Sequence, residues 1–463
     1  MYDIIIIGAG TAGISAYKEA IKHTQNILII NHGPWDTTCA RVGCMPSKVL
    51  ITSANRLHDA QSAKNVGLEI TLETNTTQVM QHVRHLRDRF TQATLKDVQQ
   101  WNPEHKISGQ AHFINANTIS VNNQQYQAKS FILAVGSTPN LQFDWKEVLK
   151  ERYITTDDFF ELKQLPKRVA VIGSGVIAIE LAQAMHRLGV EVTIFARSKK
   201  IGSLSSDTLQ ALAREHLSQE LNILFETLPQ QVRLNKHGIT IEFTNSDKQT
   251  QTLEVDYILS ATGRSSLLNT LQLTNIDSSY DNIKKLPVHL NSKQLGEYPI
   301  FIAGDAFTNT PLQHEAAHEG RMLVMQCLNP DKIQNVKTLT PLGIVFSSPE
   351  MATAGQSHAQ LKAKNIDFVV GFASYERQGR AITLGKNHGA LEVYIERASQ
   401  KLLGAELFMH QAEHLAHLLS WMIAENCNLE QMLDKPYYHP TLEEGLRTAL
   451  KHARRQLRAS QSN

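Results

Sequence analysis

Two glycine-rich turns constrain the fold of this chain more than any other feature. Each turn follows an unbroken aliphatic run, at 4–7 and 169–172, and precedes a helix-like stretch. Continuous apolar strands are typical of parallel sheets whose two faces are both covered. Further strands expected at 27–30 and 191–195 complete two βαβ units. The fingerprint positions are Gly8, Gly10 and Gly13 in the first turn, and Gly173, Gly175 and Ala178 in the second.

Glycine at such turns has a specific physical use. The first glycine allows a tight strand-to-helix turn, the second lets the backbone approach a pyrophosphate, and the third permits close helix packing. The helix N-terminus adds bare N–H groups and the positive end of a dipole. The sequence therefore predicts an α/β fold with two Rossmann-like domains, which bind two dinucleotides.

The end of the second strand in each unit bears on which dinucleotide is bound, because an acidic residue there binds the ribose hydroxyls. The first unit has Asn31, which can accept a hydrogen bond but carries no charge. The second has Ala196, followed by Arg197, Lys199 and Lys200. Cations without a carboxylate suit a 2′-phosphate, which favours NADPH over NADH at the second site. A solvated basic loop is the alternative.

Length and composition exclude several other classes of protein. The 463 residues exceed one ordinary core, and from 337 onward strand-like and helix-like runs indicate a separate α+β domain. The net charge of +2 predicts no nucleic-acid partner. No apolar run reaches the ~18 residues of a membrane span, and Asp3 argues against a secretory signal. Four cysteines are too few for a disulfide framework and favour a reducing, cytoplasmic setting.

Two of these cysteines lie close together in the sequence. Cys39 and Cys44 are separated by four residues, and Gly43 helps the intervening backbone to turn. Pro46 predicts that Cys44 lies at or before a helix N-terminus, where the dipole and Lys48 favour a thiolate. A zinc site would need further ligands, and a structural disulfide does not suit the cytoplasm. The pair is predicted to be redox-active, whereas Cys327 and Cys427 are expected in the core and no metal is expected.

Taken in order, these motifs resemble the class I pyridine nucleotide–disulfide oxidoreductases, the group of dihydrolipoamide dehydrogenase, glutathione reductase and mercuric reductase. The resemblance implies FAD at the first turn and NADP or NAD at the second. It also implies that Cys39 exchanges with a small dithiol or disulfide substrate while Cys44 contacts the flavin. Lys48 and Glu180 match the pair near the reactive flavin nitrogen.

Near the C-terminus, His439 and Glu444 match the HPTxxE element of the family. A histidine oriented by a carboxylate is an effective general base for a thiol. By resemblance, this pair acts in the site of the other subunit of a homodimer. The resemblance implies further cofactor-binding residues, namely Thr38, Ala134, Gly136, Ser137, Gly263, Arg264, Asp305, Leu312 and His314.

The resemblance also implies a domain plan and a set of candidate activities. We expect an FAD-binding domain over 1–145 and 270–336, an NAD(P)-binding domain over 146–269, and a dimerisation domain over 337–463. The motif series favours dihydrolipoyl dehydrogenase, with an NADPH-dependent reductase of glutathione or another small disulfide as the alternative. Mercuric reductase is less favoured because residues 456–463 lack a cysteine pair. A non-catalytic scaffold is disfavoured by the intact cysteine and histidine set, and docking to a multienzyme complex stays open.

Several positions depart from the family pattern. Asp36 and Thr37 stand where two glycines are usual, and Arg41 replaces an asparagine. Tyr437 replaces a histidine found in the dihydrolipoamide dehydrogenases, and Asn31 replaces a glutamate. These changes leave the electron path intact and bear on the choice of substrate.

Overall fold

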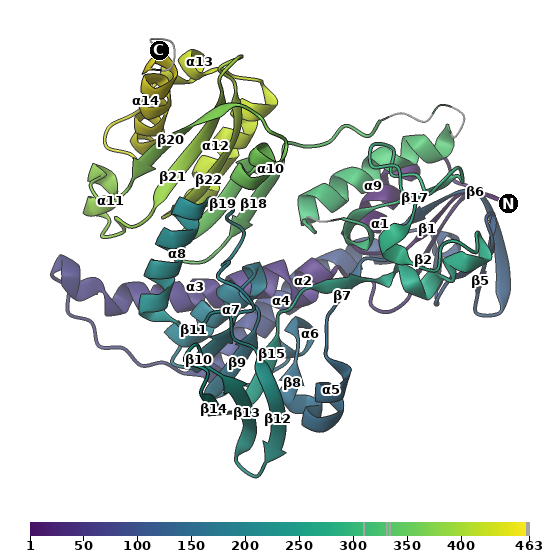
Figure 1. Cartoon of the computed structure of the whole chain (residues 1–463). Helices are drawn as coiled ribbons and strands as arrows, with labels where there is room; N and C mark the ends of the chain where they lie inside the picture. The colour runs from purple at the N-terminus through teal and green to yellow at the C-terminus, as the bar shows by residue number, and fades with distance from the viewer. Residues whose placement is uncertain (309–310, 330–331, 333–334, 460–463) are drawn as a thin grey trace. The chain divides into compact units, whose positions relative to one another are not determined.

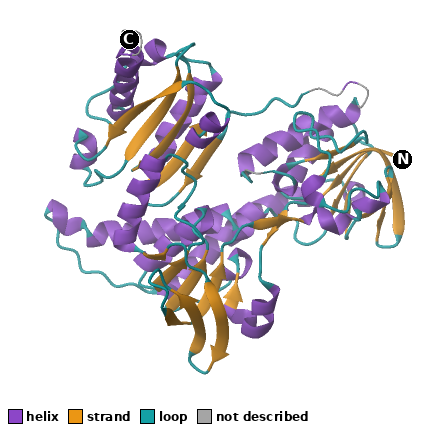
Figure 2. Cartoon of the chain, in the orientation of Figure 1, coloured by secondary structure: helices purple, strands orange, loops and turns teal. Residues whose placement is uncertain are grey.

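Two units, each assembled from three segments of the chain, make up the structure. The computed structural model describes residues 1–463 except 309–310, 330–331, 333–334 and 460–463. The first unit consists of Met1–Pro46, His82–Asn140 and Gly263–Thr338. The second consists of Ser47–Gln81, Leu141–Thr262 and Leu339–Asn463. Each unit contains one of the two glycine turns, and Figures 1 and 2 show their helices and strands.

A mixed sheet forms the centre of the first unit. Its described strands follow the order β3-β2-β1-β6-β5-β4, and β17 also pairs with β6. The pairs along β3, β2, β1, β6 and β17 are parallel, whereas β4 and β5 extend the sheet in antiparallel fashion. The strands are β1 (Tyr2–Ile7), β2 (Ile27–Asn31), β3 (Lys106–Ser108), β4 (His112–Asn115), β5 (Thr118–Val121), β6 (Gln124–Leu133) and β17 (Ile300–Ile302).

The isoleucines of β1 build a core on each face of this sheet. Successive side chains of a strand point to opposite faces, so they enter two different buried clusters. Helices α1 (Thr11–Ala20) and α9 (Gln313–Leu328) pack on one face and lie side by side in Figure 1. Their backbones approach closely, because a Cβ at Gly320 would lie 2.2 Å from the carbonyl oxygen of Ala12.

The second glycine turn belongs to a smaller parallel sheet in the second unit. Its described strands follow the order β11-β10-β9-β15-β8, and α7 (Val176–Arg187) follows the turn. An antiparallel sheet with the order β12-β13-β14 extends from it. The strands are β8 (Tyr153–Ile154), β9 (Arg168–Ile172), β10 (Glu191–Phe195), β11 (Asn222–Leu224), β12 (Pro229–Asn235), β13 (Gly238–Thr244), β14 (Thr250–Val255) and β15 (Tyr257–Ser260).

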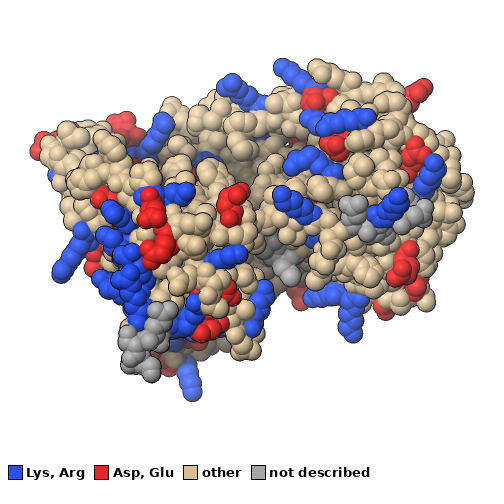
Figure 3. All heavy atoms as spheres, turned by 90° about the horizontal axis from the view of Figure 1, so that it is seen from above, with Lys and Arg blue, Asp and Glu red and all other residues tan. Residues whose placement is uncertain are grey.

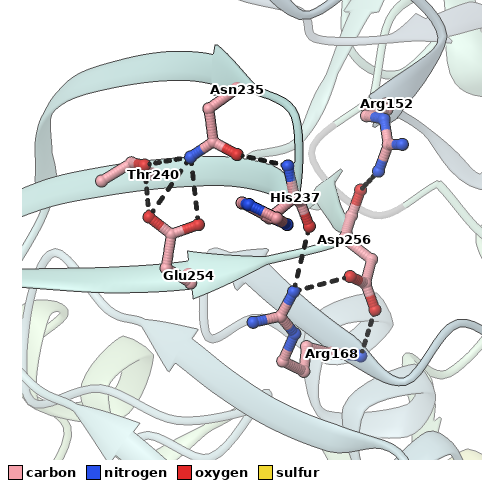
Figure 4. Close-up of polar contacts among 7 residues, drawn as sticks. All are labelled: Arg152, Arg168, Asn235, His237, Thr240, Glu254 and Asp256. Atoms are coloured by element: carbon pink, nitrogen blue, oxygen red, sulfur yellow. Dashed lines mark hydrogen bonds and ion pairs between the residues drawn. The ribbon is translucent and has the colours of Figure 1, made fainter.

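Polar side chains join these two sheets at the start of β9. Asp256, between β14 and β15, accepts hydrogen bonds from the backbone and the guanidinium of Arg168, both at 2.9 Å (Figure 4). Arg168 also donates to the carbonyl of His237 in the β12–β13 turn. Although burial opposes ionisation of Asp256, its contacts with Arg168 leave the pKa of this carboxyl below its ordinary value. The ion pair therefore fixes the antiparallel extension to the parallel sheet.

The C-terminal part of the second unit is an antiparallel sheet with helices against it (Figure 2). Its described strands follow the order β18-β19-β22-β21-β20. Helices α12 (Ala412–Ala424) and α14 (Glu444–Ala459) contribute leucines and alanines to the core of this sheet. The strands are β18 (Leu342–Val345), β19 (Glu350–Gly355), β20 (Phe368–Ser374), β21 (Ala390–Glu396) and β22 (Leu402–Met409).

The predicted fold class, two Rossmann-like units with a C-terminal α+β part, is confirmed. The strands predicted at 27–30 and 191–195 are present as β2 and β10. Cys327 is buried on α9 as expected, whereas Cys427 is half-buried and follows α12 without being part of a helix. The remaining α-helices are α2 (Thr38–Val42), α3 (Cys44–Gln61), α4 (Thr76–Gln99), α5 (Phe143–Leu149), α6 (Thr156–Phe159), α8 (Asp207–Glu220), α10 (His358–Ala363), α11 (Gly379–Thr383) and α13 (Leu429–Leu433).

The surface is mixed in charge. On the face shown in Figure 3, basic and acidic side chains are interspersed on a largely uncharged surface. Basic side chains are exposed on the last turns of α14, at Lys451, Arg455 and Arg458. Among the described residues, none of the helices combines the length and apolar character that crossing a membrane requires.

Candidate functional site

The two neighbouring cysteines lie on consecutive helices of the first unit's N-terminal segment. Cys39 is the second residue of α2, and Cys44 is the first residue of α3, as Pro46 predicts. Gly43 brings the chain back against the first cysteine, because a Cβ there would lie 3.3 Å from the Cα of Cys39. Cys39 is half-buried and Cys44 is exposed. Both predicted redox positions are therefore accessible on one tight turn, with Thr38 exposed beside them.

An ion pair braces this turn. Arg41 Nε donates to Asp36 Oδ1 at 3.0 Å, and the Asp36 side chain is only 7% exposed. The neighbouring Thr37 caps α2, because its hydroxyl accepts a hydrogen bond from the amide of Ala40 at 3.1 Å. The three residues that depart from the family pattern around Cys39 thus stabilise one local structure.

The first glycine turn is shaped by close backbone contacts. Gly8 has φ +105°, and a Cβ there would lie 2.2 Å from the carbonyl oxygen of Ala134. A Cβ at Gly13 would lie 1.8 Å from the carbonyl oxygen of Gly8, whereas one at Gly10 would meet no protein atom within 4 Å. The open side of Gly10, at the N-terminus of α1, fits the pyrophosphate of a dinucleotide.

Asn31, at the end of β2, makes its contacts within the protein. Its side-chain oxygen accepts from the amide of Ala9 at 2.9 Å, and its nitrogen donates to the carbonyls of Gly33 and Pro34. Asn31 therefore holds the glycine turn against the end of β2.

A second group of predicted residues gathers on the same unit where β7 (Ser137–Pro139) pairs with β16 (Arg264–Ser266). The Arg264 guanidinium donates to the hydroxyl and the carbonyl of Ser137, at 2.9 and 2.7 Å. Burial raises the pKa of Asp305, and the charge of Arg264 opposes this effect. A half-buried carboxylate beside hydroxyl and guanidinium groups fits the polar chain of FAD.

The remaining predicted residues of the first unit lie close in the sequence to Ser137, Arg264 and Asp305. Gly136 and Gly263 have φ +71° and +108°, values that favour glycine. Leu312 precedes α9 and is half-buried, while His314 is exposed on the first turn of that helix. Sequence reasoning missed Glu319, which lies on α9 and accepts from the amide of Gly304 at 2.8 Å.

The second glycine turn repeats the construction of the first. Gly173 has φ +118°, and a Cβ there would lie 2.5 Å from the carbonyl oxygen of Ala261. Gly175 again meets nothing within 4 Å, and Ala178 is fully buried on α7. The same geometry thus fits a second dinucleotide.

The basic loop after β10 is bonded to this turn. Ala196 is buried, whereas Arg197, Lys199 and Lys200 are exposed. The hydroxyl of Ser174, within the glycine turn, donates to the carbonyl of Lys200 at 2.7 Å. Ser174 is a second residue that sequence reasoning missed, because its partner lies 26 residues further along the chain. The fit to a 2′-phosphate rests on the three exposed cations.

Lys48 and Glu180 meet in the second unit, as the resemblance implies. Lys48 Nζ lies 2.8 Å from Glu180 Oε2, and Glu180 is 4% exposed. The other carboxylate oxygen accepts from the amide of Phe346 at 2.9 Å, and the Lys48 ammonium lies 4.6 Å from the ring centroid of Phe346. Within the second unit, this pair joins the half-buried Lys48 of α3 to the buried Glu180 of α7.

His439 and Glu444 also form the predicted pair. His439 Nδ1 lies 3.0 Å from Glu444 Oε1, and the histidine side chain is 80% exposed. Hydrogen bonds from His439 and then from the Thr441 amide lower the pKa of Glu444. Because a carboxylate only accepts, the neutral ring carries its proton on Nδ1 and presents Nε2 as a proton acceptor.

Two family models match most of the chain. The model of the pyridine nucleotide-disulphide oxidoreductase family matches residues 2–320. The model of the dimerisation domain of the same family matches residues 342–450.

Among the described residues, no cluster of three or more histidine, cysteine or acidic side chains is arranged to hold a metal ion.

Two kinds of enzyme are similar to the chain over nearly its whole length. The mercuric reductase of Staphylococcus aureus is 29% identical over 451 residues, which cover 97% of this chain and 82% of that protein. The dihydrolipoyl dehydrogenase of Geobacillus stearothermophilus is 26% identical over 449 residues, which cover 96% of this chain and 94% of that protein.

Solved structures share the fold. LpdA from Mycobacterium tuberculosis has a TM-score of 0.80 at 18% identity and covers 98% of this chain and 100% of its own. The HOCl-induced flavoprotein disulfide reductase RclA from Escherichia coli has a TM-score of 0.79 at 17% identity, covering 97% and 99%. The matches to the two family models show that the chain belongs to the pyridine nucleotide-disulphide oxidoreductase family, whose members use FAD and NAD(P)H.

Proposed function

We propose that this chain exchanges two electrons between a nicotinamide coenzyme and a small dithiol of the dihydrolipoyl class, through Cys39 and Cys44. The single observation that carries the proposal is the tight α2–α3 turn, which presents both cysteines at its accessible surface. In that turn the N-terminus of α3 lies at Cys44, where the helix dipole favours a thiolate. FAD would supply the two-electron chemistry that links the cysteine pair to the coenzyme.

The cysteine chemistry balances as two thiol–disulfide exchanges. With the Cys39–Cys44 bond formed, a substrate thiolate attacks the sulfur of Cys39, and the sulfur of Cys44 leaves as a thiolate. The second substrate thiolate attacks the substrate sulfur of the mixed disulfide and releases Cys39. The substrate is oxidised by two electrons and the cysteine pair is reduced. We propose that Nε2 of His439, oriented by Glu444, takes the substrate proton.

Residues of the two glycine turns would hold the cofactors. FAD would lie against Gly8, Gly10 and Gly13 with its polar chain at Asp305, and the nicotinamide coenzyme against Gly173 and Gly175. We assign residues 1–145 and 270–336 to FAD binding, 146–269 to the coenzyme, and 337–463 to dimerisation. Of these, 309–310, 330–331, 333–334 and 460–463 lie outside the described residues.

A second candidate is an NADPH-dependent reductase of glutathione or another small disulfide. The exposed Arg197, Lys199 and Lys200 favour it, because they follow Ala196, which stands where a carboxylate would hold a free 2′-hydroxyl. In this direction the coenzyme reduces the cysteine pair, which then reduces the substrate. We propose a homodimer in a reducing, cytoplasmic setting for both candidates, in keeping with the dimerisation-domain match and the four cysteines.

An anaerobic titration tests the proposal. Addition of one equivalent of NADPH to the flavoprotein should produce two new titratable thiols and a long-wavelength charge-transfer band. Cys44→Ser should abolish the band while the protein keeps its flavin. A thiol count that does not change on reduction would contradict the proposal. Initial rates with NADH and NADPH, each with lipoamide and glutathione disulfide, then separate the two candidates.

A further inference from the structure

The basic loop between β10 and α8 needs a fixed position if its cations are to recognise a 2′-phosphate. Arg197, Lys199 and Lys200 are all exposed, and long cationic side chains on an unsupported loop would lose much conformational entropy on binding. The backbone of the loop is in fact held at several points. These contacts show which other residues determine where the cations lie.

Helix α8 supplies most of the contacts to the loop. The buried Gln210 accepts from the amide of Ile201 at 3.0 Å and donates to the carbonyls of Ile201 and Leu204, at 2.8 and 2.7 Å. Arg214, one turn later, donates to the carbonyl of Lys199 at 3.2 Å. The position of the cations therefore follows the position of α8.

The N-terminus of α8 is held in turn by Glu406 of β22. One oxygen of this carboxylate accepts from the amides of Ser205 and Ser206, at 2.6 and 3.0 Å. The other accepts from the Ser205 hydroxyl at 2.5 Å and from the amide of His358 at 2.9 Å. Glu406 is 0% exposed, so these four charge-assisted bonds offset the cost of burying its charge.

We infer that Glu406, on the C-terminal sheet, is a positioning residue for coenzyme recognition. By fixing α8 and the basic loop, it sets the preference for a coenzyme that carries a 2′-phosphate. This inference rests on the proposed function, in which that loop binds the coenzyme. NAD bound at the glycine turn lacks the phosphate that the cations would contact. Loss of Glu406 therefore weakens NADP binding selectively.

A half-buried glutamate of the same sheet provides a matched control. Glu350, on β19, accepts from the amide of Glu413 at 2.9 Å and so holds the N-terminus of α12. Like Glu406 it joins the sheet to a helix N-terminus, but its helix carries no part of the basic loop. A substitution at Glu350 therefore reports the general effect on coenzyme binding of replacing a glutamate that joins this sheet to a helix.

The experiment measures dissociation constants of NADP⁺ and NAD⁺ for the oxidised FAD-loaded dimer by calorimetry, in wild type, Glu406→Gln, Glu406→Asp and Glu350→Gln. We expect Glu406→Gln to weaken NADP⁺ roughly tenfold and NAD⁺ less than about twofold. Glu406→Asp keeps the charge and should retain part of the preference. Glu350→Gln should leave the NADP⁺/NAD⁺ ratio unchanged.

The outcomes separate the inference from the proposal beneath it. If wild-type protein binds NAD⁺ as tightly as NADP⁺, the proposed coenzyme preference fails, and the inference fails with it. If wild type prefers NADP⁺ and both Glu406 variants keep the full preference, only the inference is overturned. An equal loss of preference in Glu350→Gln also overturns it. Should Glu406→Gln not fold, the ratio in Glu406→Asp decides by the same criterion.

Discussion

Arg41 Nε lies 3.0 Å from Asp36 Oδ1, and these two residues stand on either side of Cys39 in the chain. Both depart from the family pattern, and each is the ion-pair partner of the other. Because Asp36 is almost fully buried and Arg41 is about one-third exposed, the pair neutralises a cation next to the first cysteine. The glycine and asparagine of the usual pattern could not form this ion pair. The two departures therefore change the charges around the cysteine turn.

Removal of the acidic partner should activate Cys39. Asp36→Asn leaves the Arg41 cation without its carboxylate, which favours the thiolate form of the neighbouring cysteine. We expect alkylation of the reduced enzyme below pH 7 to become roughly threefold to tenfold faster. Stopped-flow alkylation against pH measures this rate. Asp97→Asn, which removes the partner of Lys18 elsewhere in the same unit, is the control and should show the wild-type rate.

The first glycine turn should separate folding from flavin binding. Gly13→Ala places a Cβ 1.8 Å from the carbonyl of Gly8 and should destabilise the protein by roughly 2–4 kcal/mol. Gly10→Ala meets no protein atom and should keep the thermal stability of the flavin-free protein, yet lose bound flavin. Thermal unfolding of flavin-free protein and the absorbance ratio of purified samples test both. A Gly10→Ala protein that stays fully yellow would show that no pyrophosphate lies there.

Glu444 should matter for turnover more than for folding. Glu444→Gln removes the negative charge that holds His439 Nδ1–H, so the ring loses its fixed orientation and tautomer. We expect kcat to fall roughly 10- to 100-fold, with flavin content and coenzyme reduction of the cysteine pair unchanged. Rapid-reaction kinetics separates the two half-reactions. An equal loss in the coenzyme half-reaction would contradict the role assigned to the pair.

Mixing of inactive dimers tests whether His439 acts across the subunit interface. Cys39→Ser and His439→Gln homodimers are each expected to be inactive. If the site takes its cysteines from one subunit and its histidine from the other, heterodimers formed by exchange contain one intact site. Activity should then return to about a quarter of the wild-type value at equal mixing. No recovery, despite heterodimers detected by native mass spectrometry, would place both residues in one subunit.

Glu350 should make stability depend on pH. Burial raises the pKa of Glu350 from 4.5 to about 7, so between these values the folded state holds a proton that the unfolded state has released. The stability of the wild-type protein therefore falls across this window as the pH rises. Glu350→Gln removes this dependence and should gain roughly 2 kcal/mol relative to wild type between pH 5 and pH 8. Urea unfolding at both pH values measures the difference, and Glu425→Gln at an exposed position should show none.

The local parts of the structure follow from the sequence because their causes are local. The strands at 27–30 and 191–195 match their predictions, since their aliphatic side chains are buried in parallel sheets. Pro46 places Cys44 at the first position of α3 by the same logic. The pairs Lys48–Glu180 and His439–Glu444 were expected from the family motifs, and both contacts are present.

Contacts between distant segments could not be predicted in this way. Glu406 and Ser205 lie 201 residues apart, and a glutamate in a strand gives no sign of its partner. Asp36 and Arg41 are near in sequence, but only the fold shows that they pair and that the aspartate is buried. Periodicity and spacing identify elements and motifs, while the side chains that fix motif geometry become visible only when the sheets are assembled.

The hydrogen bond from Ser174 to the carbonyl of Lys200 has a practical consequence for redesign. An engineer who wished to exchange the coenzyme would be tempted to transplant only the three cations. In this chain the glycine turn, the basic loop and α8 are bonded to one another. A protein that received only the three cations would lack these bonds, so it would not hold the cations in the same positions. A graft that keeps these bonds would run from Gly173 to Arg214 and would need a carboxylate at position 406.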